Sequence, residues 1–201
     1  MLTPLEARIL GALMEKQLTT PDAYPLTLNS LQLACNQKTN REPVINLQEG
    51  ALQQCLYGLQ DRKLVEFDYG ARANKFNQRL ARTLHFEKPE QAIICIMLLR
   101  GPQTSGELLS RCERLAKFSD SDDLRHCLHR LQQREPALVC QLPRAPGHRE
   151  DRYAQLLCGP IDESEWLSAA ASAAAACRKE SPVAASASGS MTTRTSSDGR
   201  P

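Results

Sequence analysis

The segments LQQCLYGLQDRKLVEF (residues 52–67) and LRHCLHRLQQREPALVCQL (residues 124–142) decide the fold, because they are two copies of one pattern. Six positions, each 72 residues apart, are identical: Leu52/Leu124, Cys55/Cys127, Leu56/Leu128, Leu59/Leu131, Gln60/Gln132 and Arg62/Arg134. Their apolar members recur at i, i+3, i+4 and i+7, the spacing of one face of an amphipathic helix. Each copy therefore predicts a helix that buries leucine and cysteine.

A β-hairpin is predicted after each of these helices. The runs LVEFDY (64–69) and LVCQL (138–142) suit strands, and the basic, turn-prone stretches GARANK and PRAPGHRE follow them. The segments FNQRLART (76–83) and DRYAQLL (151–157) supply the second strands.

Two more helices precede the repeat in the first copy. Thr3 and Glu6 form a capping box around Pro4, which occupies the first helical position. A second helix is expected over about residues 27–37, and Asn46 is expected to cap the third.

The second copy has the same order. Pro89 is expected to begin the helix PEQAIICIMLLR, and Thr104 with Glu107 caps the next one. Ser119 or Ser121 is expected to cap the third helix. The run AIICIMLL (92–99) is apolar all round, so it predicts a helix covered by both copies.

Three helices followed by a two-stranded hairpin are typical of the winged-helix variant of helix-turn-helix. We therefore predict a mainly α fold with small β-hairpins, built from two tandem winged-helix domains over residues 1–85 and 86–160. The alanine-rich residues 161–180 favour a C-terminal helix. Residues 181–201, dominated by Ala, Ser, Thr and Gly, predict a disordered tail.

Composition narrows the function classes. The 201 residues carry a formal net charge of +2, and no segment has the 18 or so apolar residues of a membrane span. The N-terminus lacks the pattern of a secretory signal, so a cytoplasmic location and no membrane partner are expected. The sequence pI of about 8.1 is below that of most dedicated nucleic-acid domains, so DNA binding would depend on local clusters of charge.

The eight cysteines include no C-x-x-C pair, and four of them fall among apolar residues of predicted helices. His126 and His129 are three residues apart and could meet, but the apolar stripe takes Cys127 between them, so core thiols are favoured over a metal site. G-x-S-x-G, P-loop, H-E-x-x-H and G-x-G-x-x-G motifs are all missing. No enzyme activity, metal or cofactor is expected.

Four stretches carry a family resemblance: LEARILGALMEK, TTPDAYPLTLNSLQLACNQKTNREPV (19–44), LLRGPQTSGEL and LPRAPGHREDRYAQLL (142–157). Over about residues 2–158 the chain resembles the YceH-like family of bacterial proteins. That resemblance implies a tandem winged-helix fold and a bacterial cytosolic protein, and it supplies no biochemical activity.

The second hairpin gives the sharpest hypothesis of a site. Arg144, His148, Arg149 and Arg152 surround its turn and could contact DNA phosphates. The alternative is that Glu150 and Asp151 pair with these arginines and fix the hairpin.

The first copy offers further candidates. Gln48, Gln53 and Gln54 on the third helix could pair with adenine edges. The turn NQKTNRE before it supplies Lys38, Asn40 and Arg41, which suit either phosphate contact or a structured turn. Arg72 and Lys75 lie in the first hairpin, where phosphate contact is expected.

Two features weigh against simple DNA recognition. The third helix of the second copy begins SDSDD, whose acids would meet phosphates, although they also suit a helix N-terminus. The loop TTPDAYPLTLNS is interpreted as packing, with Tyr24 and Leu26 beneath it, or else as a partner-binding loop.

These observations lead to two hypotheses. The first is regulatory DNA binding, with both hairpins and the first recognition helix facing one double-stranded DNA. The second is a winged-helix adaptor that binds a protein partner. The sequence leaves the oligomeric state open, a homodimer included.

Overall fold

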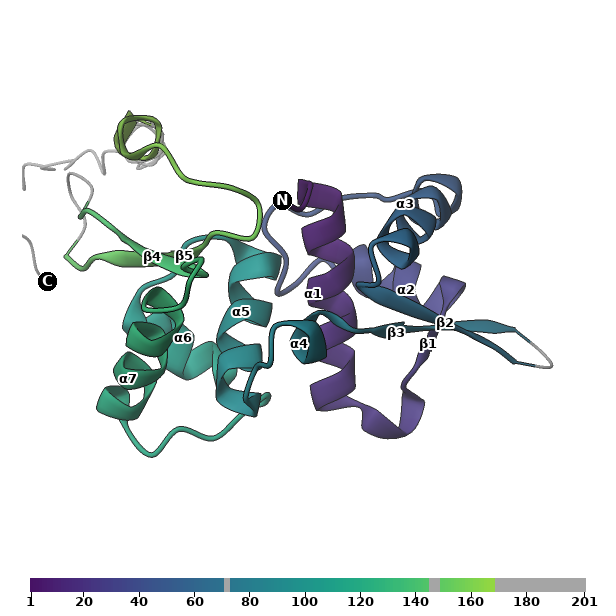
Figure 1. The fold of residues 1–201 in the computed structure, drawn as a ribbon, viewed down its shortest axis with the longest axis horizontal. Coiled ribbons are helices and arrows are strands. Elements are labelled where there is room, and N and C mark those ends of the chain that lie inside the picture. The colour runs from purple at the N-terminus through teal and green to yellow at the C-terminus, as the bar shows by residue number, and fades with distance from the viewer. Residues whose placement is uncertain (71–72, 145–148, 169–201) are drawn as a thin grey trace, which may run out of the picture.

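Two helices, α1 (Pro4–Thr19) and α5 (Lys88–Arg100), lie side by side at the centre of the computed structural model (Figure 1). The structure describes residues 1–70, 73–144 and 149–168. The other elements lie on either side of this pair. We call residues 1–85 the first half and residues 86–160 the second half.

The first half contains the predicted three helices and hairpin, with additional short elements. A two-residue strand pairs with β3 and makes a three-stranded antiparallel sheet of order β1-β3-β2. The elements after α1 are η1 (Pro21–Ala23), β1 (Leu26–Thr27), α2 (Leu28–Cys35), α3 (Glu49–Asp61), β2 (Val65–Tyr69), β3 (Asn74–Gln78) and α4 (Leu80–Thr83).

The second half repeats three helices and a hairpin. Its elements after α5 are α6 (Ser105–Cys112), α7 (Ser121–Gln132), β4 (Val139–Leu142) and β5 (Arg152–Gln155). Residues 163–168 are helical, and the Trp166 indole donates to the Pro143 carbonyl at 3.1 Å, so this segment docks beside the hairpin. The expected helix therefore starts two residues later than position 161, and its residues from 169 on lie, with the expected tail, outside the described residues.

Local signals located several helix starts correctly. Capping boxes are present at Thr3 with Glu6 and at Thr104 with Glu107, which confirms both predictions. Helix α5 begins one residue before Pro89, and the Glu90 carboxylate accepts from the N–H of its N-cap residue Glu87 at 3.1 Å.

Two predicted caps were wrong. Helix α3 starts after Gln48 and not after Asn46, because the Asn36 side-chain amide bonds both the N–H and the carbonyl of Leu47 and holds that residue outside the helix. Helix α7 is capped by Asp120 in place of the predicted serines. The aspartate accepts two backbone N–H groups, at 2.9 and 2.8 Å.

The second strand of the first hairpin is shorter than FNQRLART predicts. It ends at Gln78, and α4 follows. The Gln78 side-chain carbonyl accepts from the Ala81 N–H at 3.0 Å, so the chain turns into a helix at this point. Leu80 and Ala81 are thereby buried against the core.

The loop before α2 is structural, as the packing interpretation predicts. The Tyr24 hydroxyl donates to Asn77 at 2.8 Å and accepts from the Gln78 N–H at 2.7 Å. Leu26 is buried.

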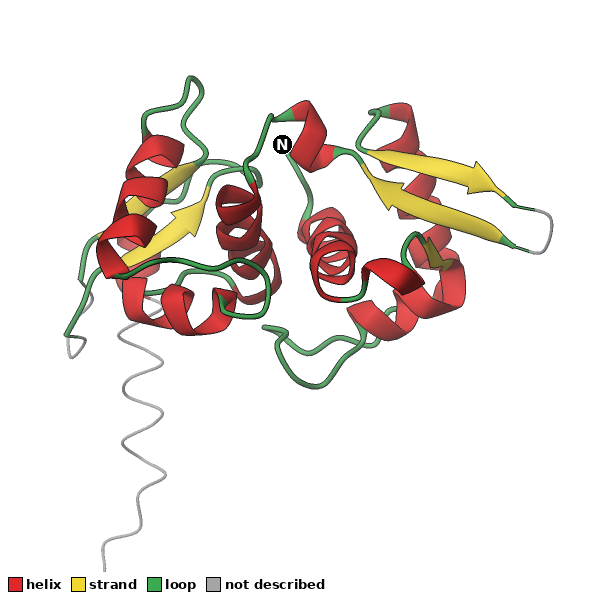
Figure 2. Ribbon diagram, turned by 90° about the horizontal axis from the view of Figure 1, so that it is seen from below, coloured by secondary structure: helices red, strands yellow, loops and turns green. Residues whose placement is uncertain are grey.

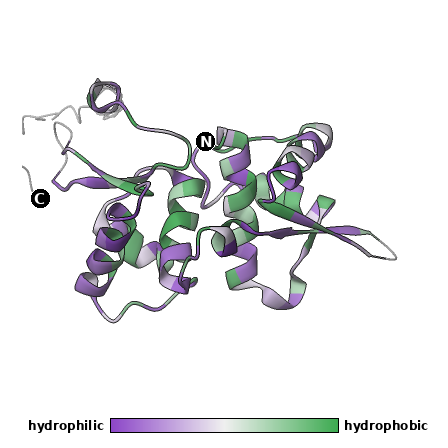
Figure 3. Ribbon diagram, in the orientation of Figure 1, coloured by the Kyte–Doolittle hydropathy of each residue, from purple (hydrophilic) through white to green (hydrophobic). Residues whose placement is uncertain are grey.

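The interface between α1 and α5 joins the halves. Every residue from Glu90 to Leu99 is buried, which confirms the prediction for AIICIMLL, and the apolar sides of the two helices face each other (Figure 3). The buried apolar side chains form one connected cluster that runs through both halves. The helices touch at Gly11, whose carbonyl accepts from the Cys95 thiol at 3.3 Å.

The arginine shared by the two repeats has the same role in each half. Arg62 donates to Glu6 at 2.8 and 2.9 Å, and Arg134 donates to Glu90 at 2.8 Å. Each glutamate is the third residue of the first helix of its half and part of its capping box. The repeat thus extends from sequence to side-chain contacts.

Candidate nucleic-acid interface

Helix α3 presents a polar face to solvent. It buries Leu52, Leu56 and Leu59, and the opposite face is exposed. Three glutamines lie there, as the sequence predicts: Gln48, Gln53 and Gln54. Gln53 donates to the Tyr57 hydroxyl at 3.3 Å, so its amide oxygen can still accept a hydrogen bond.

The β2–β3 hairpin extends from the body beside α3 (Figures 1 and 2). Lys75 is exposed on β3 and makes no ion pair with any described residue. Arg72, the other predicted cation of this hairpin, lies outside the described residues.

An aromatic row that the sequence analysis missed links α3 to this hairpin. The Phe67 ring lies 5.6 Å from that of Tyr57 and 6.1 Å from that of Tyr69, between centroids. Tyr57 is 50% exposed and Tyr69 is 70% exposed. Tyr57 falls outside the apolar spacing of α3, whereas Tyr69 continues the alternation of Val65 and Phe67 beyond the buried part of β2.

The predicted cations described in the β4–β5 hairpin fall into two groups, those that are exposed and one that is ion-paired. Arg144 and Arg149 are exposed and form no ion pair within the described part of the chain. Together with Arg125 they line a groove of about 570 Å³ beside the N-terminus of α6. His148 lies outside the described residues.

The structure corrects the prediction that Arg152 contacts a DNA phosphate. Its guanidinium donates to Glu107 at 2.7 Å and to the Pro102 carbonyl at 2.9 Å, which fixes β5 on the start of α6. Burial alone would raise the pKa of Glu107, but the Thr104 N–H and the charge of Arg152 lower it. The pairing alternative therefore holds for this arginine, with Glu107 as the partner instead of Glu150 or Asp151.

Most of the basic face of α7 is also paired. Arg125 donates to Asp122 at 2.6 Å, and Arg130 donates to Glu87 at 2.8 Å. With Asp120 serving as a cap, the acidic start of this helix is a structural feature that leaves little free charge for DNA.

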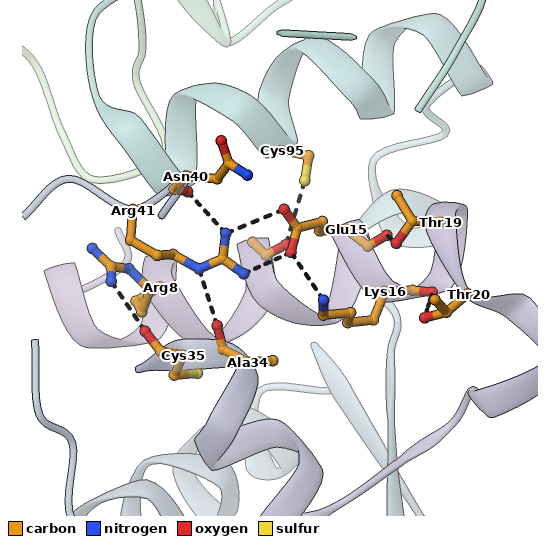
Figure 4. A network of polar contacts seen from close by, with 11 residues as sticks. Arg8, Glu15, Lys16, Thr19, Thr20, Ala34, Cys35, Asn40, Arg41 and Cys95 are labelled. Carbon is orange, nitrogen blue, oxygen red and sulfur yellow. Dashed lines mark hydrogen bonds and ion pairs between the residues drawn. The ribbon is translucent and has the colours of Figure 1, made fainter. Parts of the chain in front are cut away.

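The structure also corrects the prediction that Arg41 contacts a DNA phosphate. Its side chain is fully buried, and it donates to both oxygens of Glu15, at 3.2 and 2.6 Å, and to the Ala34 carbonyl at 3.0 Å (Figure 4). Arg8 donates in the same region to the Cys35 carbonyl at 3.2 Å. The two guanidinium groups thus stabilise the C-terminal, partially negative end of α2.

Lys38 and Asn40 are also excluded from the candidate interface, for a reason other than burial. They are exposed, but they line a groove between the two halves together with residues of α1, α5 and α6. The lining of that groove includes none of the glutamines Gln48, Gln53 and Gln54.

The candidate interface consists of two surfaces. We define the first-half surface as Gln48, Gln53, Gln54, Tyr57, Tyr69 and Lys75, and the second-half surface as Arg125, Arg144 and Arg149. The two hairpins project toward opposite ends of the molecule in both views (Figures 1 and 2).

The cysteines of the predicted helices behave as core residues. Cys35, Cys95, Cys112 and Cys127 are buried, Cys55 is half-buried against the core, and burial raises the pKa of each of these thiols. Among the described residues, no cluster of three His, Cys, Asp or Glu side chains could hold a metal. No helix in the same part of the chain has the length and apolar character needed to cross a membrane.

Comparison with known proteins gives a family and close relatives. Residues 2–148 match the family described as protein of unknown function, DUF480. A UPF0502 protein of Cellvibrio japonicus is 55% identical over 162 residues, which cover 81% of this chain and 74% of the relative. UPF0502 proteins of Xanthomonas campestris pv. campestris (strain B100) and Stenotrophomonas maltophilia are 53% and 49% identical, over 86% and 81% of this chain and 77% and 74% of their own lengths.

Proposed function

The chain belongs to the DUF480 family of bacterial proteins of unknown function, and we propose that it binds duplex DNA in a regulatory role. The proposal includes the finer fold assignment: each half is taken as a winged-helix domain, in line with the resemblance to the YceH-like family. It also takes the cytoplasm as the site of action.

One observation carries the proposal. Helix α3 and the β2–β3 hairpin together present amide groups, exposed tyrosines and an unpaired cation on one surface. In a winged-helix complex the third helix lies in the major groove and the wing lies along the backbone. Gln53 would then read base edges while Lys75 contacts a phosphate.

The second-half surface adds phosphate contacts without base recognition. Arg144 and Arg149 are exposed cations of its hairpin, and α7 offers aspartates where base contacts would be needed. Because the hairpins project toward opposite ends, we propose contacts at separate places along a duplex, in place of a clamp that closes on one point.

A salt titration tests this function. Three phosphate contacts, from Lys75, Arg144 and Arg149, give a log–log slope of about −2.7, so affinity should fall about fortyfold between about 50 and 200 mM salt. Anisotropy of a labelled random duplex of about 20 base pairs measures it.

Charge-reversal variants locate the contact. Lys75→Glu should weaken binding and reduce the salt slope by about one, whereas Lys88→Glu, an exposed lysine at the start of α5, should not. Arg144→Glu with Arg149→Glu should abolish binding. Absence of binding by the wild type at about 50 mM salt would refute the proposal.

A second candidate function is a protein–protein adaptor, and exposed apolar side chains favour it. Leu33, Val44, Tyr57 and Tyr69 are all at least half exposed, and all lie in the first half. If the duplex does not bind, Leu33→Ser and Val44→Ser should reduce co-purification of a partner, which direct pull-down measures.

A further inference from the structure

A groove of about 650 Å³ lies between the two halves, away from both proposed DNA-binding surfaces. The end of α1 and the turn after α2 form one wall, and the ends of α5 and α6 form the other. Equal numbers of residues come from each half, so the groove exists only because α1 and α5 pack together.

Positive charge dominates this groove. Its lining includes two carboxylates, Glu15 and Glu113, and five cations: Lys16, Lys38, Arg100, Arg111 and Arg114. The carboxylate of Glu15 is already engaged by the buried Arg41 at 2.6 Å, which leaves little of its charge for the groove.

The arginines of the second wall lack close partners. Arg111 is 3.6 Å from Glu107, but that carboxylate is held more closely by Arg152, at 2.7 Å. Arg100 and Arg114 make no ion pair within the described residues. Burial, and next the charge of Arg111, lower the pKa of the partly buried Arg100, and the carboxylates of Glu42 and Glu107 act in the opposite direction without reversing the shift.

Helix ends explain part of this arrangement but not all of it. Lys16 and Arg100 are in the last turns of α1 and α5, where a cation interacts favourably with the helix dipole. Lys38 and Arg114 lie in loops after α2 and α6, so the dipole gives no reason for them to face the same groove.

The remaining lining groups indicate the chemistry of a ligand. Hydroxyl and amide groups come from Thr19, Gln37, Thr39, Asn40 and Ser110, and the apolar lining is limited to Ile96 and Leu115 with no aromatic ring. Guanidinium and ammonium groups bind phosphate oxygens well, whereas a nucleobase usually needs a stacking surface. The volume suits a small molecule.

We propose that this groove binds a small, non-aromatic anion that carries two or more phosphate groups. Such a ligand would connect the two walls and so stabilise the packing of α1 against α5. Glu42 already connects them, since its N–H donates to the Leu99 carbonyl at 2.8 Å. The proposal stands independently of DNA binding, because the groove shares no residue with the two DNA-binding surfaces.

Calorimetric titration of the full chain with tripolyphosphate tests the proposal. One equivalent should bind, and Arg100→Gln with Arg114→Gln should weaken affinity by about tenfold or more for each arginine. The control, Arg144→Gln with Arg149→Gln, removes the same charge from the second hairpin and should leave affinity unchanged. Binding that is absent, or equally strong in both double variants, would overturn the proposal.

Two further measurements complete the test. Arg114 is exposed, so Arg114→Gln alone should keep the wild-type melting temperature and still weaken tripolyphosphate binding. The phosphate groups that bind the groove could belong to a small free compound or to the DNA backbone. Competition between tripolyphosphate and a labelled duplex distinguishes these two sources. Tripolyphosphate at a concentration that saturates the groove should leave a duplex bound to the wild-type protein in place. Displacement of the duplex that is lost in Arg100→Gln with Arg114→Gln would assign the groove to DNA and overturn the small ligand.

Discussion

Replacing Gly11 by alanine is expected to destabilise the protein at the contact between its two halves. A Cβ at this position would lie 2.9 Å from Cγ and Cδ2 of Leu99 and 3.1 Å from Cβ of Leu98. Real Cβ atoms essentially never approach other atoms within 3.0 Å. Leu99 is fully buried, so it has little space into which to move.

The size of the effect follows from two opposing contributions. Overpacking a close-packed core costs about 1 to 3 kcal/mol. Alanine in a helix interior is favoured over glycine by about 0.8 to 1 kcal/mol. The net change for Gly11→Ala is therefore a loss of up to about 2 kcal/mol.

A matched variant separates these contributions. Gly58 lies within α3, and a Cβ there would meet nothing within 4 Å. Gly58→Ala should gain the helix-propensity contribution alone and stabilise the protein by about 0.8 kcal/mol. The difference between the two variants, about 1 to 3 kcal/mol, then isolates the contact between α1 and α5.

Thermal and urea unfolding measure this difference. For a chain of this size, 1 kcal/mol corresponds to about 2 to 4 °C in Tm, so the two variants should differ by about 2 to 12 °C. If Gly11→Ala is as stable as Gly58→Ala, the close approach of the helices at this glycine is refuted.

Three further predictions concern ion pairs and titration. Arg134→Ala should cost about 2 to 4 kcal/mol in unfolding free energy, because it leaves buried Glu90 without its closest partner, whereas Arg125→Ala should cost less than about 0.5 kcal/mol because its pair is exposed. Equal losses in urea unfolding would contradict this difference. Burial raises the pKa of the Cys35 and Cys112 thiols to about 12, so folding favours the protonated thiols. Stability should be intact below about pH 9 and fall by about 1 to 3 kcal/mol at pH 10, and Cys112→Ala should reduce that dependence. Although burial raises the pKa of Glu6, the Thr3 N–H and Arg62 lower it overall, so unfolding free energy should also fall as pH drops below about 4.5. Arg62→Ala should make that fall shallower, and an unchanged slope would contradict the role of Arg62.

The sequence by itself determined the elements that depend on local pattern. Spacing of Leu52, Leu56 and Leu59 predicts the buried face of α3, and the capping residues at Thr3 and Thr104 predict two helix starts, because both signals act within a few residues. The all-apolar run at 92–99 predicted a helix covered from every side, which the packing of α1 on α5 confirms.

Only the tertiary structure decided which charges remain available for a ligand. Arg41 pairs with Glu15, 26 residues earlier, and Arg152 pairs with Glu107, 45 residues earlier, whereas Arg144 and Arg149 stay exposed. In the sequence these four arginines look alike. Two of them are ion-paired and two are exposed, because an ion pair between residues so far apart in the sequence depends on which helix ends the packed core brings together. The cationic groove between the halves arises from that same packing.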